Sequence, residues 1–218
     1  MKERNITVTL EQAKKWLNSG NLTLKVLALQ AFSEDELKSD FMKITTFKDA
    51  CEILYYDYNA VSSIINDDLL RFSKASAAMF KLNIIRKALN LGQDLHLTEN
   101  RKDERLYYPC NPFITKDSTY YKDELDLGKM ERIGMIKSEG VLYSVLGDCA
   151  SFYGDTGLGS FYHGSNVGFA DANPGFLGCA TKEIAEHFSK YFGMLITEAK
   201  YADMVDFQII EDKYGNTK

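Results

Sequence analysis

One thiol of the sequence lies in a context that could support nucleophilic chemistry. Cys149 directly follows Asp148, and the histidines that come after it in the chain are His163 and His187. A cysteine nucleophile needs a neighbouring base that holds it as the thiolate. Neither histidine stands in a motif that would place it beside the thiol. We therefore expect Cys149 to be a buried structural cysteine and assign no catalytic residue.

The segment around this thiol can also be compared with a known enzyme family. Asp148-Cys149-Ala150-Ser151-Phe152 resembles the Asp-Cys-Ser-Gly start of the nucleophile helix in NlpC/P60-type cysteine peptidases, and Asn166-Val167-Gly168-Phe169 resembles their His-Val-Gly strand. Asn166 stands where that family has its histidine. Glycines 154, 157 and 159 also follow the thiol and disfavour the helix that the family needs. The resemblance therefore implies no peptidase activity.

His187 is the second candidate for acid–base chemistry. Glu183 stands four residues before it on the helix expected over residues 181–201, where it could orient the imidazole as a general base. The helical periodicity places His187 at the polar margin of the apolar stripe, however. We therefore expect a boundary histidine in an ordinary i, i+4 interaction with Glu183.

No motif for a metal or a cofactor is present in the sequence. Its three histidines and four cysteines show neither Cys-x-x-Cys nor His-Glu-x-x-His spacing. Residues 154–159 are rich in glycine, but no lysine or arginine occurs between Ser138 and Thr181 to hold a phosphate. We expect no metal, no cofactor and reduced thiols.

Glycine is distributed unevenly, which indicates two kinds of architecture. Of 15 glycines, only Gly20 and Gly92 precede residue 128. Glycine gathers where the backbone turns tightly or takes a positive φ. The sequence therefore predicts an α+β fold, with a helical region over residues 1–92 and an α+β region over residues 106–218.

The helical region is predicted from capping residues and apolar periodicity. Thr9 and Gln12 form a capping box at the start of the first helix, and Ser33 and Glu36 form another at the start of the third. Asn21 can begin the second helix, with apolar residues 24, 27, 28 and 31 facing inward. A fourth helix follows Thr46. The clearest helix runs over residues 73–90, and we expect Lys74, Lys81 and Lys87 on its solvated face.

The C-terminal region combines strands with one long helix. Residues 130–136 and 141–146 are apolar and β-rich, and the intervening Lys137-Ser138-Glu139-Gly140 predicts a hairpin turn. The helix over residues 181–201 carries a buried stripe of Ile184, Phe188, Tyr191, Phe192, Leu195 and Ala199. A short final strand is expected over residues 205–210.

Residues 147–178 are the predicted functional surface, because glycines alternate there with aromatic residues and no cation occurs. Tyr153, Tyr162 and Phe169 are the candidate binding residues. Tyrosine offers both a stacking surface and a hydroxyl, which suits a protein surface or a neutral glycan. The alternative interpretation is a compact β-region in which these aromatic side chains fill the core.

Overall charge limits the classes of partner. The net charge is −5, and residues 1–100 carry equal numbers of basic and acidic side chains, whereas phosphate neutralisation supplies most non-specific affinity for nucleic acid. No stretch is apolar enough for a membrane span, and no signal-peptide pattern is present. The sequence thus argues against nucleic acid and membrane partners and predicts a soluble protein.

Three segments carry a further resemblance: residues 9–21 (TLEQAKKWLNSGN), 78–89 (AMFKLNIIRKAL) and 178–192 (GCATKEIAEHFSKYF). They are similar to a group of phage- and prophage-encoded proteins of Bacteroides-type gut bacteria, for which no activity is established. The resemblance implies a non-enzymatic binding or structural accessory protein in the host cytoplasm or on the virion. The alternatives are a hydrolase-like enzyme with an unrecognised site and a helical nucleic-acid-binding regulator.

Overall fold

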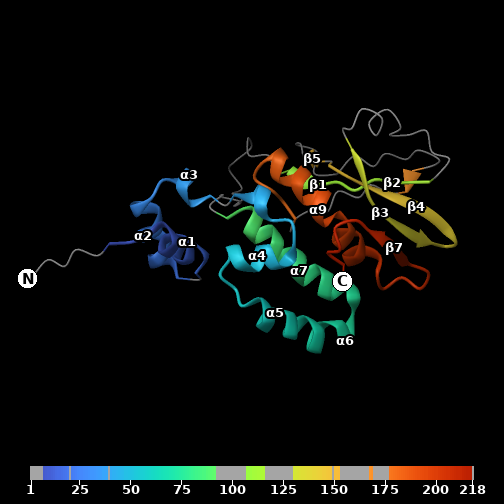
Figure 1. The fold of residues 1–218 in the computed structure, drawn as a ribbon, viewed down its shortest axis with the longest axis horizontal. Coiled ribbons are helices and arrows are strands. Elements are labelled where there is room, and N and C mark those ends of the chain that lie inside the picture. Colours follow the sequence, from blue (N-terminus) through green and yellow to red (C-terminus); the bar gives the residue numbers. More distant parts are fainter. Residues whose placement is uncertain are drawn as a thin grey trace, which may run out of the picture.

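The computed structural model describes residues 7–19, 21–38, 40–91, 107–115, 130–148, 150–152, 167–168 and 177–217. Over these residues the chain has the predicted α+β fold: helices come first, an antiparallel sheet follows, and the long helix α9 (Lys182–Tyr201) packs between them (Figure 1). The core is not formed between strands alone. Side chains on both sides of α9 contribute to it.

The helical part begins with a separate cluster of three helices and continues into a larger group. Its elements are α1 (Leu10–Asn18), α2 (Leu22–Ala31), α3 (Glu34–Leu37), the 3-10 helix η1 (Phe41–Lys43), α4 (Phe47–Ile53), α5 (Tyr58–Ile64), the π-helix η2 (Ile65–Leu69), α6 (Leu70–Phe72) and α7 (Lys74–Leu89). Figure 1 shows α1 to α3 at one end of the molecule, beside the group that α4 to α7 form.

The predicted helix starts are confirmed by their capping bonds. The Thr9 hydroxyl accepts from the Gln12 backbone N–H, and the Asn21 side chain accepts from the N–H groups of residues 23 and 24. Ser33 and Glu36 bond reciprocally, as a capping box requires. Thr46 begins α4 in the same way with Asp49. These caps satisfy backbone donors that a helix leaves unpaired at its N-terminus.

The strands form one larger sheet and one small ribbon. The five-stranded sheet has the order β6-β2-β4-β3-β7, and β1 pairs with β5; every pair is antiparallel. The strands are β1 (Tyr107–Pro109), β2 (Phe113–Ile114), β3 (Glu131–Ser138), β4 (Val141–Gly147), β5 (Ala150–Phe152), β6 (Val167–Gly168) and β7 (Gln208–Asp212). The last strand begins later than predicted, since the apolar Val205 is fully solvent-exposed and lies outside the sheet.

The predicted hairpin joins β3 to β4. Glu139 and Gly140 have φ angles of 49° and 79°, and Ser138 pairs with Val141 on either side of them. Positive φ at both central residues is the backbone of a two-residue turn whose twist matches that of the strands. The prediction of a positive φ at the glycine is thus confirmed, and Glu139 adopts one as well.

The main core joins the two halves of the sequence. One cluster of buried side chains contains residues from 44 to 91 and from 177 to 199, and α7 packs directly on α9. A second cluster lies between α9 and the sheet, where Met194 meets Ile133, Ile136 and Val145. The division into regions 1–92 and 106–218 itself stays a prediction, but buried residues from 44 to 91 share one core with buried residues from 177 to 199.

The predicted stripe on α9 is confirmed, but burial extends beyond it. Of its six residues, five are buried and Tyr191 is half-buried. Ser189, Gly193 and Thr197 on other faces of the helix are buried as well. The reason is that α9 is enclosed by α7 on one side and by β3, β4 and the β1–β5 ribbon on the other.

The prediction for His187 was wrong. Its side chain is buried, and its Nε2 lies 2.8 Å from the carbonyl oxygen of Ile44. Because that carbonyl can only accept, Nε2 carries the proton and donates. The ring also packs against Phe41 and Tyr191. Glu183 is not its partner, and His187 ties α9 to the segment before α4.

Candidate functional site

The three binding residues predicted from the sequence, Tyr153, Tyr162 and Phe169, lie outside the described residues, and so does Cys149. Their role stays a prediction. In the described part, Cys51 and Cys179 are buried free thiols. Burial raises the pKa of Cys51 to about 11 and that of Cys179 to about 12. Neither is a thiolate near neutral pH, so neither can act as a nucleophile there.

The lysines of α7 do not form the single solvated face that we expected. Lys87 donates to the Tyr56 hydroxyl at 2.8 Å, whereas Lys81 is half-buried and faces Glu198 of α9. Burial lowers the pKa of Lys81, and the Glu198 charge partly opposes that effect. Lys81 has no hydrogen bond or direct ion pair with the described residues. Sequence periodicity could not predict the partial burial of Lys81, because it does not show which helix packs beside the lysine.

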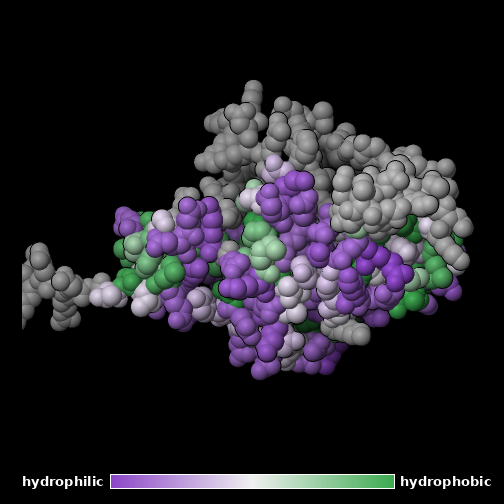
Figure 2. All heavy atoms as spheres, turned by 45° about the horizontal axis from the view of Figure 1, so that its top comes forward, coloured by the Kyte–Doolittle hydropathy of each residue, from purple (hydrophilic) through white to green (hydrophobic). Residues whose placement is uncertain are grey.

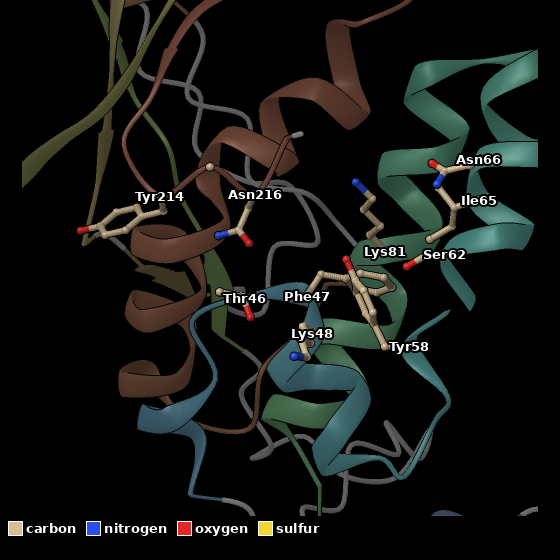
Figure 3. A pocket seen from close by; sticks show the side chains of 11 residues that line it. Thr46, Phe47, Lys48, Tyr58, Ser62, Ile65, Asn66, Lys81, Tyr214 and Asn216 are labelled. Carbon is tan, nitrogen blue, oxygen red and sulfur yellow. The ribbon is translucent and has the colours of Figure 1, made fainter. Parts of the chain in front are cut away.

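Lys81 reaches into a cavity of about 270 Å³. Figure 3 shows its ammonium group between Tyr58 and Ser62 on one side and Thr46 and Asn216 on the other. The cavity lies where α4, α5, η2 and α7 meet the segment that follows β7. The residues that line it are Thr46, Phe47, Lys48, Tyr58, Ser62, Ile65, Asn66, Lys81, Tyr214, Gly215 and Asn216.

One wall of this cavity is a continuous row of polar side chains. Tyr58, Ser62 and Asn66 follow one another at intervals of four residues, the first two on α5 and the third on η2. Four residues fall just beyond one α-helical turn, so such a row would drift around a straight helix. The wider π-turn at η2 reduces this drift, and π-turns are frequent at functional sites. Ile65 is buried beneath the row and anchors it.

The C-terminal segment forms the opposite wall, and a charged network holds it in place. The Tyr214 hydroxyl donates to Glu131 of β3, and Lys213 donates to the same carboxylate at 2.8 Å. Lys190 of α9 lies 3.5 Å from Glu131 and 3.1 Å from Asp148. These donors hold the pKa of Glu131 below its usual value despite partial burial. The Asn216 amide donates to the carbonyls of Thr45 and Tyr191 and closes this side.

A second candidate site is an apolar surface on α2. Leu22, Val26 and Leu29 are 75%, 44% and 50% exposed, and their spacing of four and three residues places them on one face of the helix. At this end of the molecule, Figure 2 shows green apolar residues interspersed with purple polar ones. Of the residues expected to face inward, Ala28 is buried and Leu24 is half-buried, but Leu27 is 43% exposed and Ala31 is exposed.

The face of α2 that turns inward could not be predicted from the sequence, because the helix is apolar on every side. A helix that is apolar all round is normally buried all round. Here the buried core of α1 to α3 consists of Ala13, Ala28 and Leu37, with four further side chains packed partly against it. Among the elements that the structure describes, none covers the apolar face defined by Leu22, Val26 and Leu29.

Comparison with known proteins gives no relative for this chain: no family model, no curated protein and no solved structure matches it. In the described ranges there is no group of three or more His, Cys, Asp or Glu side chains arranged to hold a metal ion. None of the helices that the structure describes combines the length and the hydropathy of a membrane span.

Proposed function

We propose that this chain is a non-enzymatic binding protein that docks onto a partner protein by placing α2 in an apolar groove of that partner. The observation that carries the proposal is the exposed apolar face of Leu22, Val26 and Leu29. Contiguous exposed apolar surface on a globular protein marks an interaction site. Helix-in-groove recognition uses anchors with this spacing along one helix.

The small core of α1 to α3 supports the same proposal. Two of its three fully buried side chains are alanines, which bury little surface. Burying a leucine or valine side chain contributes roughly 1.5 to 3 kcal/mol relative to leaving it exposed. Covering three such side chains, each about half-exposed, would therefore contribute on the order of 3 kcal/mol. A partner groove would supply stability that this cluster lacks on its own.

The size of the face favours a groove over a flat contact with a second copy. A helix of 10 residues is about 15 Å long, at 1.5 Å per residue. A stable interface buries about 800 Å² on each partner, which one face of so short a helix does not provide. A groove can enclose both Leu27 and the face opposite Ala28, and so uses nearly the whole helix.

The cavity beside Lys81 supports binding more than catalysis. The residues that line it include no carboxylate, histidine or cysteine, and Ser62 and Lys81 have no hydrogen bond to each other, which is the contact by which a base activates a nucleophile. Glu198 lines a neighbouring hollow, between α9 and β7. A hydrolase-like activity would need a base in contact with its nucleophile, and no such contact is present among the described residues of the cavity wall.

Site-specific photo-crosslinking tests the docking proposal. A photoreactive phenylalanine is placed at Leu22 or Leu29 in the native host, with Phe72 as the matched control because it is 86% exposed but lies on α6. We expect one partner to be crosslinked from positions 22 and 29 and not from 72. With that partner purified, the double variant Leu22→Ser/Leu29→Ser should weaken binding about 30-fold, since about 2 of the 3 kcal/mol is lost.

Two results would contradict the proposal. One is that position 72 captures the same partner as positions 22 and 29. The other is that the double variant, folded by circular dichroism, binds the purified partner with unchanged affinity. Crosslinking of α2 to a second copy of this chain, together with a dimer in light scattering, would also contradict the proposal, because the occupant of the apolar face would then be this chain itself.

The phage or prophage origin and the contact role of Tyr153, Tyr162 and Phe169 are further parts of the proposal. The resemblance of residues 9–21, 78–89 and 178–192 supports the origin. It is tested by the neighbourhood of the coding gene: tail and structural genes would favour a virion component, and replication or repressor genes a regulator. Binding screens with Tyr153→Ala and Tyr162→Ala proteins test the aromatic contact.

A further inference from the structure

The cavity beside Lys81 has four hydrogen-bond donors that the described protein does not use. They are the Lys81 ammonium, the hydroxyls of Tyr58 and Ser62, and the Asn66 amide. None of them has a hydrogen bond or ion pair with a described residue. Tyr58 and Asn66 are exposed, but Lys81 and Ser62 are half-buried, and an ammonium group taken partly out of water normally gains a partner. An unpaired, half-buried Lys81 in a hollow with three neutral donors therefore indicates that a ligand with acceptor atoms fits there.

Charge limits the occupant to an anion. Lys81 and Lys48 are the charged side chains in the described wall, and Lys48 is largely exposed, with Glu52 at 3.8 Å. Lys81 is thus the one ammonium group at depth in this wall. Glu198 of α9 is the charge that acts on Lys81, and Lys74 and Asp212 act in turn on Glu198. These three side chains line the neighbouring hollow, and none of them lines the cavity.

The number of donors favours a carboxylate over a phosphate. A carboxylate carries one negative charge and accepts about four hydrogen bonds, which matches one ammonium and three neutral donors. A phosphate monoester carries nearly two negative charges near neutral pH, whereas Lys81 is the one ammonium group at depth in the described wall. Phosphate sites also often use arginine forks, and the described wall contains no arginine.

We propose that this cavity binds a small organic acid, with its carboxylate between Lys81, Tyr58, Ser62 and Asn66 and its apolar body against Phe47 and Ile65. Phe47 and Ile65 are buried in the cavity wall and provide the apolar surface that small-molecule sites usually have. The site is separate from α2, so this inference does not depend on the docking proposal.

Lysine-selective NMR with benzoate as the probe tests the inference. The Lys81 side-chain signal is assigned by its disappearance in Lys81→Met, and benzoate is titrated into the unaltered protein. We expect the Lys81 signal to move with saturation at roughly millimolar benzoate, an affinity suited to so small a ligand. The Lys87 signal on the same helix should stay in place. Benzamide, which has the same shape without the charge, should bind at least 10-fold more weakly.

Matched variants locate the carboxylate. Ser62→Ala and Asn66→Ala should each weaken benzoate binding about 3- to 10-fold, measured by the same titration of the Lys81 side-chain signal. Ser63→Ala is the control, since Ser63 is the next residue on α5 but bonds to Asp67 at 2.6 Å outside the cavity. Phenyl phosphate should bind more weakly than benzoate; tighter binding of phenyl phosphate would overturn the carboxylate assignment.

The titration of the unaltered protein keeps the inference falsifiable even if a variant does not fold. Equal shifts at Lys81, Lys48 and Lys87 would show a general ionic effect and overturn it. So would equal affinity for benzoate and benzamide, because the ammonium would then contribute nothing.

Discussion

At the residue scale, burial acts on two facing side chains of opposite charge. It lowers the pKa of Lys81 on α7 and raises that of Glu198 on α9 to about 7. Each group attracts the other, but for both of them burial is the larger cause. Transfer of a charge from water is costly unless it gains direct hydrogen-bonded partners. The pair therefore makes the fold depend on pH.

We predict that Glu198→Gln stabilises the protein above neutral pH. The folded-state pKa of Glu198, about 7, lies above its unfolded value, so its contribution is full at acid pH and is lost as the pH rises through about 7. Each pKa unit corresponds to about 1.4 kcal/mol. Because the carboxyl is partly exposed, solvent screening reduces the effect, and we expect a gain of roughly 1 to 2 kcal/mol at pH 8. Urea unfolding from pH 5 to 8 measures it.

His187 also contributes to the pH dependence of stability, with the opposite sign, so Glu198→Gln must be compared with the unaltered protein at each pH. Burial lowers the pKa of His187, and its contribution to stability is lost as the pH falls. This term is common to both proteins and cancels in their difference. A difference between Glu198→Gln and the unaltered protein that does not grow from pH 5 to pH 8 would contradict the prediction.

Gly193 is a residue whose small size the packing requires. A Cβ at this position would collide with the Asn111 side-chain amide and with Ile133. The amide cannot move aside, because it donates to the Leu146 carbonyl at 2.9 Å and to Ser189 at 3.1 Å. We predict that Gly193→Ala lowers the free energy of unfolding by roughly 2 kcal/mol, although alanine favours helices. Gly140→Ala is the comparison variant. Its added Cβ would meet no atom within 4 Å, so its loss of stability measures the cost of a positive φ alone.

At the element scale, local signals predicted the starts of the helices and the hairpin turn. Thr9, Asn21 and Thr181 cap helices through bonds within a few residues, so sequence alone contains the cause. The inward face of α2 and the burial of His187 depend on contacts with distant segments. The same holds for the cavity, since Lys81 and Asn66 line one hollow only after α7 and η2 have packed.

The central stripe of α9 carries the largest predicted loss of stability. Phe188 and Leu195 are fully buried, and removal of either side chain leaves a cavity that neighbouring elements cannot close. We predict that Phe188→Ala and Leu195→Ala each cost about 3 to 5 kcal/mol. Denaturant unfolding at constant pH measures these losses.

The control for this prediction must be chosen from the structure. Lys190, which the sequence would suggest as a solvent-exposed position, bonds to Asp148 and Glu131. Lys182→Ala is better, because its pair with Glu186 is exposed and contributes only about 0.5 kcal/mol. Losses as small for Phe188→Ala as for Lys182→Ala would show that α9 is not packed as described.

At the scale of the whole molecule, the helical group and the C-terminal part share one core, whereas α1 to α3 have a small core of their own. The shared cluster joins α4 and α7 to α9. Cooperative units follow contiguous buried surface more than sequence order. We therefore expect the chain to unfold in two steps that do not correspond to its N- and C-terminal halves.

We predict that α1 to α3 open at lower urea than the shared core, and that the core then unfolds as one unit. Trp16 is the single tryptophan of the chain and packs in the α1–α3 cluster, so its fluorescence reports the first step. Cys51 precedes the chain region 92–106 and Cys179 follows it, and both are fully buried in the shared core. Their raised pKa values and burial protect them from alkylation until the core opens.

Pulsed alkylation at increasing urea, read for each cysteine peptide by mass spectrometry, decides whether the core is one unit. Cys51 and Cys179 should become reactive at the same urea concentration, and that concentration should exceed the midpoint of the Trp16 fluorescence change. Reaction of Cys51 at clearly lower urea than Cys179 would mean that the helical group unfolds independently, because the α7–α9 contact would then contribute too little to couple them. A Trp16 midpoint equal to that of both thiols would mean that α1 to α3 need no partner to reach the stability of the core, which would remove one of the two supports for docking through α2.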